Sequence, residues 1–393
     1  MRRGPRRVQA SSFRPLGDRR AEWAARLAMI ASARRFLYVS TYFLEPDDYG
    51  LRFVDALIRA AERGVHVALV VDSFGQRLAT TATTTEQDAV LEERLETLRS
   101  LGADVGFYRP GRILERTLGA GQHIKIQLSD AGEAIFGSSN ISHRSFEAWD
   151  EFSVALRGPV VGTLLASFYR WLDRPDRAHL RSLARLARED ARRAVEPFDL
   201  TWWAWDPNDD PGALGPVVRE HDNPVTTELA RAISAAECSI RVTSFYFKPA
   251  PVLLDALEGA ARRGVHVEVR HSHRSALEGN IYPWLSSALD YPRLLEAGVQ
   301  IDEDLSGEHS KLLLVDDTWV AFGSYNFEWA ADDRLAEAMI TTTDVRICGQ
   351  VGAFLDSLAE HRPAERVAPD AVEHWPSELR LRGLLFAPLK RWV

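Results

Sequence analysis

The sequence is poor in lysine and cysteine, and it lacks a long apolar run. Only four of its 48 basic residues are lysine, and two of these are Lys125 and Lys311. Two cysteines in 393 residues are too few for a disulfide framework or a cysteine-rich zinc site. Because no run of about 18 apolar residues occurs, we predict no transmembrane helix.

An excess of positive charge is also missing, since the formal net charge is −8 at pH 7. A nucleic-acid-binding protein usually carries a basic balance or a basic stripe, so the composition argues against nucleic acid as a partner. The first 20 residues are rich in arginine but lack the apolar core of a secretory signal. We expect a basic disordered arm there, with a tether to anionic lipid as the alternative.

One motif occurs twice, with the second copy 186 residues after the first. Both copies have the pattern HxKx4Dx6GSxN, and a glutamate follows 28 residues after each histidine. The matched residues are His123 and His309, Lys125 and Lys311, Asp130 and Asp316, Ser138 and Ser324, Asn140 and Asn326, and Glu151 and Glu337. Two complete copies favour a shared function over coincidence.

The spacing predicts how the motif folds. His and Lys are two residues apart on a predicted strand, so both side chains point to one face. A hairpin turn at the Asp then returns GSxN beside them. We predict that the Ser and Asn bind phosphate and that the Glu orients the histidine by accepting from its ring N–H. We group the Asp with the catalytic residues, and its alternative role is to fix the hairpin turn or to pair with a nearby cation.

Two such half-sites suit the transfer of a phosphodiester. One imidazole can attack phosphorus while the other protonates the leaving oxygen. A second acceptor then attacks the phosphorus of the phosphohistidine, the P–N bond breaks, and the other histidine takes the acceptor's proton. The lysines and asparagines neutralise charge on the non-bridging oxygens. We expect neither a metal nor a cofactor.

The order of predicted strands and helices is repeated as well. In both halves a helix ends at a glycine, Gly64 or Gly264, and residues 63–67 recur unchanged at 263–267. Alternating strands and helices predict an α/β fold. We expect two homologous lobes, each a mixed and mostly parallel sheet flanked by helices, related by a pseudo-twofold with the active site between them.

These elements divide the chain into five segments. We expect the arm over 1–20, lobe 1 over 21–179, a connector over 180–223, lobe 2 over 224–363 and a C-terminal tail over 364–393. The connector begins as an Arg-rich helix and then becomes rich in turns, and its cluster Trp202–Trp205 either packs under the linker or contacts a membrane. The tail, which mixes leucine with arginine, either docks on its own lobe or lies in a membrane interface.

Two further histidines, His271 and His273, follow a predicted strand at the edge where open α/β sheets bind ligands. The two histidines could contact a head group or phosphate, bind a metal ion together, or lie in a solvated loop. Asp72 and Ser73 occupy the corresponding place in the first half and are weaker candidates for substrate contact.

The doubled motif resembles the signature of the phospholipase D superfamily, and the likeness covers roughly residues 25–360. Within that superfamily the chain is most similar to bacterial cardiolipin synthases that lack N-terminal membrane helices. An aromatic pair after the first strand of each half adds to the likeness, because Ser40–Phe43 matches Ser244–Phe247.

The resemblance implies a phosphatidyltransferase that moves a phosphatidyl group onto a lipid alcohol, with His123 as nucleophile and His309 as acid. It also implies a phospholipid substrate, contact with an anionic membrane surface, and a cytoplasmic location peripheral to the inner membrane. One alternative is a phosphodiesterase or nuclease that uses water as the acceptor. Another is a noncatalytic lipid-binding scaffold.

Overall fold

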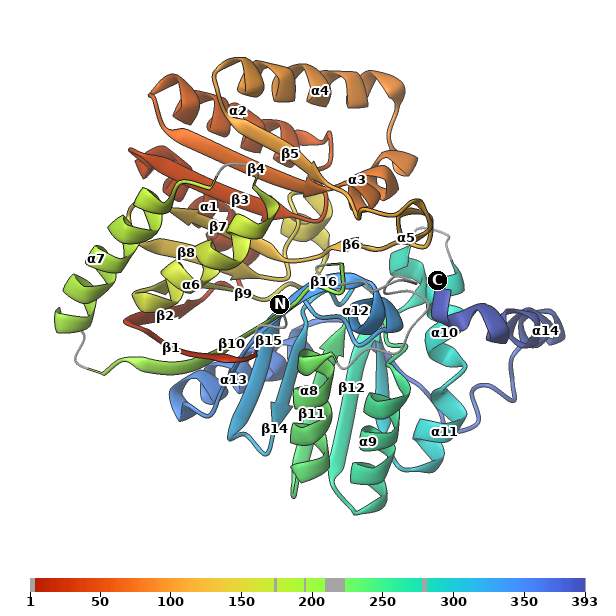
Figure 1. The fold of residues 1–393 in the computed structure, drawn as a ribbon. Coiled ribbons are helices and arrows are strands. Elements are labelled where there is room, and N and C mark those ends of the chain that lie inside the picture. The colour runs from red at the N-terminus through yellow and green to blue at the C-terminus, as the bar shows by residue number, and fades with distance from the viewer. Residues whose placement is uncertain (1–3, 173–174, 194–195, 209–222, 278–280, 393) are drawn as a thin grey trace. The chain divides into compact units, whose positions relative to one another are not determined.

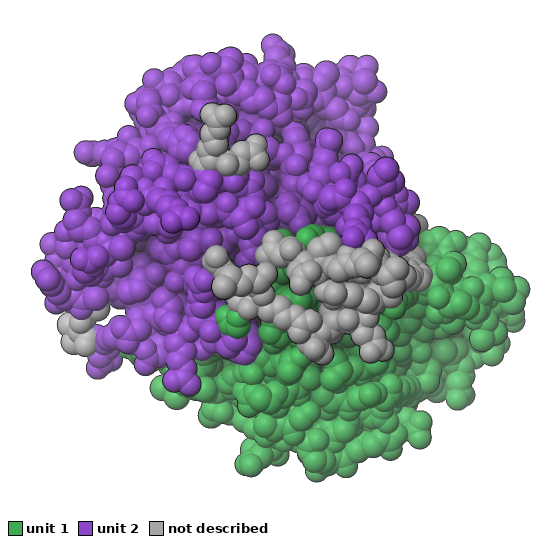
Figure 2. All heavy atoms as spheres, in the orientation of Figure 1, with its two compact units in different colours: residues 1–4, 205–393 green, residues 5–204 purple. Residues whose placement is uncertain are grey.

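The computed structural model describes residues 4–172, 175–193, 196–208, 223–277 and 281–392. The chain divides into an N-terminal unit of residues 5–204 and a C-terminal unit formed mainly by residues 205–393 (Figure 2). Each unit contains a sheet with helices packed on it, so the predicted α/β class and the two lobes are confirmed.

The N-terminal unit is built on a mixed sheet (Figure 1). Its strands are, in sheet order, β2 (Ser12–Pro15), β9 (Ser153–Arg157), β8 (Glu133–Gly137), β7 (Lys125–Ser129), β3 (Phe36–Thr41), β4 (His66–Asp72) and β5 (Asp104–Tyr108). Its helices are α1 (Arg19–Ser32), α2 (Asp48–Glu62), α3 (Ser73–Ala79), α4 (Thr85–Ser100), α5 (Ile113–Thr117), α6 (Pro159–Phe168) and α7 (Arg177–Arg193).

In the C-terminal unit, the first six strands named next repeat the order from β9 to β5, and the seventh is added at the far edge (Figure 1). Its strands are β16 (Leu335–Thr342), β15 (Trp319–Gly323), β14 (Leu312–Val315), β11 (Ser239–Ser244), β12 (His266–Ser272), β13 (Gln300–Asp304) and β17 (Ala364–Arg366). Its helices are α8 (Pro224–Ala235), α9 (Pro251–Arg262), α10 (Ile281–Ala288), α11 (Tyr291–Glu296), α12 (Trp329–Asp333), α13 (Val345–His361) and α14 (Ser377–Phe386).

The parallel part of each sheet is smaller than the sequence predicted. Among the strands named above, β3, β4 and β5 pair in parallel in the first unit, and β11, β12 and β13 in the second. The pairs β7–β8, β8–β9, β14–β15 and β15–β16 are all antiparallel. The cause is the motif itself, because its hairpin and the strand after it must reverse direction.

Local sequence sets the ends of the helices that cover these sheets. Asp47 begins α2 by accepting from the backbone N–H groups of Tyr49 and Gly50. The same helix stops before Gly64, whose φ of 83° is a conformation that favours glycine. The apolar faces of α1, α2 and α4 then pack into one buried cluster with β3 and β4.

Residues 6–15 form two strands, so the prediction of a disordered arm is wrong there. β1 (Arg6–Ala10) pairs with β10 (Phe198–Trp205), and β2 pairs with the edge strand β9. Ala10 and Phe13 are buried, and the ladder hydrogen bonds offset the entropy cost of ordering the segment. Residues 1–3 of the predicted arm lie outside the described residues.

The connector is more regular than predicted. Its Arg-rich helix is α7, and the tryptophan cluster belongs to strand β10 rather than to a turn. Trp202 is 2% exposed, its ring centroid lies 5.0 Å from that of Phe136, and its Nε1 donates to Ser167 Oγ at 3.0 Å. Packing within the first unit therefore accounts for Trp202. Residues 194–195 and 209–222 of the connector lie outside the described part of the chain.

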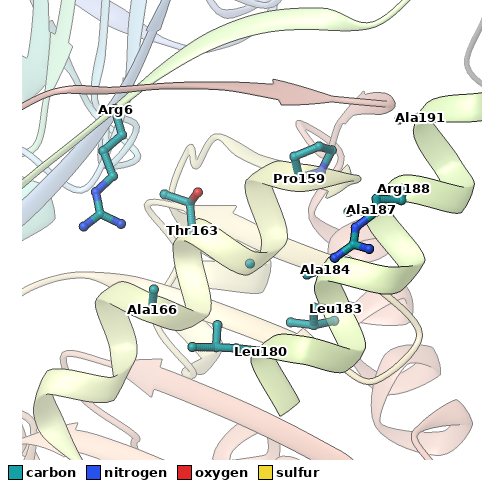
Figure 3. A pocket seen from close by; sticks show the side chains of 11 residues that line it. Arg6, Pro159, Thr163, Ala166, Leu180, Leu183, Ala184, Ala187, Arg188 and Ala191 are labelled. Carbon is teal, nitrogen blue, oxygen red and sulfur yellow. The ribbon is translucent and has the colours of Figure 1, made fainter. Parts of the chain in front are cut away.

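A cavity of about 440 Å³ lies between α6 and α7 (Figure 3). Small and apolar side chains such as Thr163, Ala166, Leu180 and Ala184 line most of it. None of the repeated motif residues takes part in its lining.

We predict that Trp202→Ala lowers the free energy of unfolding by about 4 kcal/mol, because it leaves a large cavity against Phe136. Trp202→Phe keeps most of the packing and loses the hydrogen bond to Ser167, at a cost of about 1 kcal/mol. Urea titration followed by circular dichroism measures both. Equal and small effects would contradict a core role for this side chain.

Candidate functional site

In the first half-site, His123 lies two residues before the start of β7, and Lys125 is the first residue of that strand. His123 is 4% exposed, and its ring centroid is 4.7 Å from that of Tyr42 in an edge arrangement. Lys125 Nζ donates to the carbonyl oxygen of His123 at 2.7 Å and lies 5.3 Å from the centroid of the Tyr42 ring. The imidazole and the ammonium thus share one aromatic neighbour, as expected for side chains on one face of a strand.

The second half-site repeats this geometry. The ring of His309 is 4.9 Å from that of Phe245, again edge to face, and Lys311 Nζ donates to the carbonyl of His309. Both histidines and both lysines are buried.

The strand pairing aligns the aromatic residues of the two halves one residue away from the alignment that the sequence suggests. Phe36 pairs with His66 and Ser239 pairs with His266, so the two strands start at equivalent positions. Tyr42 therefore corresponds to Phe245 rather than to Tyr246. Counting from the strands, not from the aromatic pair, would have given the correct register.

Each GSxN serine is hydrogen-bonded to the downstream glutamate. Ser138 Oγ donates to Glu151 Oε2 at 2.5 Å and accepts from the backbone N–H of Phe152 at 2.9 Å. Ser324 donates to Glu337 in the same way and accepts from the N–H of Ala338 at 3.0 Å. Because these bonds use the hydroxyl proton, the serines support the glutamates instead of pointing a donor at a phosphate.

In the first copy, the structure explains why the GSxN segment begins with glycine. A Cβ on Gly137 would lie 2.4 Å from the carbonyl oxygen of Phe152 and 2.5 Å from Ser153 Cα. Only glycine allows β8 and β9 to approach this closely. This close approach brings Ser138 within reach of Glu151.

The two asparagines differ in their surroundings. Asn140 Oδ1 lies 3.4 Å from Thr41 Oγ1, and its buried Nδ2 has no hydrogen-bond partner within the described chain. Asn326 Nδ2 instead donates to Glu328 Oε1 at 3.0 Å. Glu328 also forms an ion pair with Lys248 at 3.2 Å. The Asn140 amide therefore has both N–H donors without a partner in the described chain, whereas the Asn326 amide gives one of its two N–H donors to Glu328.

The two motif aspartates are not near the histidines. Asp130 follows the far end of β7, about 16 Å along the strand from Lys125. It accepts from the backbone N–H of Arg34 at 2.9 Å. Asp316, with φ of 52°, accepts from three backbone N–H groups, the nearest at 2.7 Å on Cys238. Their positions fit the alternative role of fixing the hairpin, and we no longer group them with the catalytic residues.

His271 and His273 face an internal network rather than a ligand. His271 is buried, and its Nε2 donates to the Tyr291 hydroxyl at 2.6 Å, which donates in turn to Glu303. Trp284 Nε1 donates to the same carboxylate at 2.6 Å, and His273 Nε2 lies 3.8 Å from it. Burial lowers the pKa of His271, which favours the neutral ring.

Asp72 links helix α3 to the chain that leads into His123. Its carboxylate accepts from the backbone N–H groups of Phe74 and Gly75 at 2.9 and 2.8 Å, and from that of Gln122 at 2.8 Å. Burial raises the pKa of Asp72 to about 7, against the lowering effect of these N–H groups and of Lys125. This aspartate is thus a cap, and its carboxylate is directed to backbone.

The sequence analysis missed the residue that precedes each motif histidine. Gln122 Oε1 accepts from the backbone N–H of Ile124 at 3.1 Å, and Glu308 Oε1 accepts from that of Ser310 at 2.8 Å. Both side chains brace the bend before the lysine. The signal that could have found them is an acceptor side chain in the same place in both copies.

Within the described ranges, no three His, Cys, Asp or Glu side chains are grouped so that they could hold a metal ion. Nor is any described helix both long and apolar enough to cross a membrane.

A family model described as "Cardiolipin synthase, PLD-like domain" matches residues 27–174 and 229–359. The two ranges contain both copies of the motif and make up more than half of the chain. The chain belongs to the phospholipase D-like family. Membership explains why the motif, the hairpin and the glutamate recur together in each unit.

Named relatives lie within the same family. The chain is 25% identical over 332 residues to a cardiolipin synthase of Halalkalibacterium halodurans, covering 81% of this chain and 60% of the relative. It is 27% identical over 318 residues to cardiolipin synthase B of Salmonella typhimurium, covering 76% and 68%. The chain thus spans about three fifths of the first relative and about two thirds of the second.

Among solved structures, phosphatidylserine synthase of Haemophilus influenzae has the same fold. The TM-score is 0.74 at 16% sequence identity, and the match covers 99% of this chain and 97% of that one. At this identity the likeness concerns the fold.

We predict that Asp316→Ala lowers the free energy of unfolding by about 2 kcal/mol and Asp130→Ala by about 1 kcal/mol, in line with the backbone bonds each loses. The three N–H bonds, against burial, hold the pKa of Asp316 below its usual value. The contribution is therefore present above a pH of about 3.9 and is lost as pH falls through the folded pKa.

Urea titrations of the wild type and of Asp316→Ala at neutral and acidic pH measure the loss of unfolding free energy, and this loss should be smaller in acid. Turnover per folded molecule should fall less than about tenfold in either variant, since neither side chain touches the histidines. A loss of turnover as large as that caused by replacing a histidine would return the aspartates to the catalytic group.

Proposed function

We propose that the chain is a phosphatidyltransferase of the cardiolipin-synthase type. The observation that carries the proposal is the completeness of both half-sites. Each has a buried histidine edge-on to an aromatic ring, a buried lysine bonded to the carbonyl of that histidine, and a buried Ser–Glu pair. A noncatalytic scaffold gives no reason to keep two such sets. The choice of a phospholipid as the substrate follows from the relatives, which are named cardiolipin synthases.

The proposed reaction has two displacements at phosphorus. His123 Nε2 attacks the phosphodiester, the bond from phosphorus to the leaving alcohol breaks, and His309 gives its proton to the departing oxygen. A lipid alcohol then attacks the phosphohistidine and passes its proton to His309 as the P–N bond breaks. Lys125 and Lys311 balance the charge on the non-bridging oxygens in both steps.

The difference between the asparagines supports His123 as the nucleophile. A phosphoryl group held covalently needs donors for its non-bridging oxygens throughout the intermediate. Asn140 has an amide N–H pair without a partner among the described residues, whereas the amide of Asn326 is bonded to Glu328. Glu151 and Glu337, buried behind the serines, are proposed to keep each histidine in one tautomer.

We predict that His123→Ala and His309→Ala each lower phosphatidyl transfer by at least about 10⁴-fold. His361→Ala, an exposed histidine on α13, is the matched control and should keep the wild-type rate. Products are analysed after incubation with phosphatidylglycerol vesicles and, in parallel, with single-stranded DNA.

Circular dichroism confirms that each variant is folded. Turnover in either motif variant above about one per cent of the wild-type rate would refute the two-histidine mechanism. DNA cleavage without lipid turnover would replace the proposal with a nuclease. Release of the lipid head group to water alone would replace it with a hydrolase.

We further propose that helix α14 contacts the membrane surface. Phe386 is buried, with its ring 5.1 Å from that of Tyr282, and Lys390 and Arg391 pair with Asp290 and Asp333. The helix is therefore docked on its own unit. Four leucines of the segment nevertheless face outward, namely Leu381, Leu384, Leu385 and Leu389. Exposed leucines beside arginines are typical of interfacial helices.

We predict that Leu384→Gln with Leu385→Gln weakens binding to lipid vesicles roughly tenfold, because two side chains no longer enter the apolar layer. Val252→Gln with Val345→Gln removes comparable exposed apolar surface from the same unit and is the control. Co-sedimentation with vesicles measures both. An equal loss in the two double variants would show that α14 has no special part in binding.

A further inference from the structure

Three arginines line a cavity of about 300 Å³ in the N-terminal unit, outside the repeated motif. Its lining residues are Ser73, Phe74, Arg77, Arg109, Arg116 and Ala120. They come from α3, from the residue after β5, from α5 and from the residue before β6 (Gly121–Gln122). The strands β4 and β5 are parallel, and Asp72 pairs with Tyr108 at their ends. The cavity thus lies at the edge where open α/β sheets bind ligands.

The charge of these arginines is not neutralised. Within the described ranges, none of Arg77, Arg109 and Arg116 forms an ion pair with a carboxylate. Arg116 Nε donates to the carbonyl oxygen of Pro110 at 2.6 Å, and the Arg77 guanidinium lies 5.0 Å from the centroid of the Phe74 ring. Both contacts hold a guanidinium in place and leave its charge intact. Three like charges around one cavity attract an anion, and the guanidinium fork suits a phosphate.

The nearest acid on α5 does not cancel this charge. Glu115 is buried, and its Oε1 lies 3.8 Å from Nε of Arg112, which is not part of the cavity lining. Arg77, Arg109 and Arg116 are all exposed to solvent.

Exposed apolar side chains stand on the same two helices. Ile113 is 78% exposed and Leu114 is 54% exposed, both on α5, and Leu78 on α3 is 48% exposed. Leucine and isoleucine side chains that are exposed to water do not stabilise a short helix. Cationic and apolar groups side by side match a lipid surface, which offers phosphates at one depth and acyl chains just below.

Asp72 connects the wall of the cavity to the chain that leads into the first half-site. Asp72 accepts from Phe74 on the cavity side and from Gln122, the residue before His123. A Cβ at Gly121 would lie 2.6 Å from Asp72 Oδ2, so no side chain separates the two segments. A lipid held at the arginines would have its head group beside the chain that carries the proposed nucleophile.

We propose that this cavity binds the phosphate of an anionic phospholipid, with Leu78, Ile113 and Leu114 entering the apolar layer of the same surface. The inference rests on the proposed function for its choice of a lipid over other phosphate esters. The phosphate bound here is a second one, separate from the phosphodiester at His123.

The test compares two triple variants that remove equal charge. R77Q/R109Q/R116Q removes the cavity arginines, and R181Q/R185Q/R192Q removes three exposed arginines from α7. Binding to vesicles of phosphatidylcholine with phosphatidylglycerol, and of phosphatidylcholine alone, is measured by co-sedimentation. We expect the cavity variant to lose on the order of a hundredfold in affinity for the anionic vesicles and the α7 variant less than about threefold.

The single change R109Q keeps the test valid if the cavity triple variant does not fold, and we expect a loss of about fivefold from it. Equal losses in the two triple variants, or unchanged binding in the cavity variants, would overturn the proposal. Saturable binding of glycerol 3-phosphate that depends on these arginines, without a change in vesicle binding, would assign the cavity to a soluble phosphate ester. Since the readout is binding, absence of lipid transfer in the wild type would refute the proposed function and leave this result standing.

Discussion

A buried hydrogen bond from the GSxN serine to a glutamate holds each half-site together. Ser138 and Glu151 are both fully buried, as are Ser324 and Glu337. The bond ties the end of the motif hairpin to the segment that leads into the next strand, two residues before the motif asparagine. A carboxylate at this depth is costly unless it is bonded, so losing the serine would disturb the glutamate and everything it positions.

Although the motif is written twice, the two half-sites are not equal. Asn140 keeps its amide donor, while Asn326 is part of a chain that runs through Glu328 to Lys248. The ring against the first histidine is a tyrosine and the ring against the second is a phenylalanine. The proposed mechanism gives the two histidines different roles, attack on phosphorus and proton transfer, and the two environments differ as well. This asymmetry gives a physical basis for assigning the histidines to separate steps.

The sequence predicted the half-sites because spacing in a strand fixes which side chains share a face. It could not assign Ser138, since a serine near a lysine suits phosphate binding as well as support of a carboxylate. The edge strands β1 and β2 were missed because they are short and interrupted by arginine, and their order comes from pairing with distant strands. Arg77 and Arg109 meet only because two parallel strands end together, which no local pattern reveals.

The central claim is that both histidines act on one phosphodiester through a covalent intermediate. The stereochemical course at phosphorus tests it most directly, with a phospholipid donor made chiral at that atom by isotopic or sulfur substitution. Each in-line displacement inverts the configuration, so two successive displacements predict net retention in the product. Net inversion would mean that the acceptor attacks the donor in a single step, and it would contradict the account.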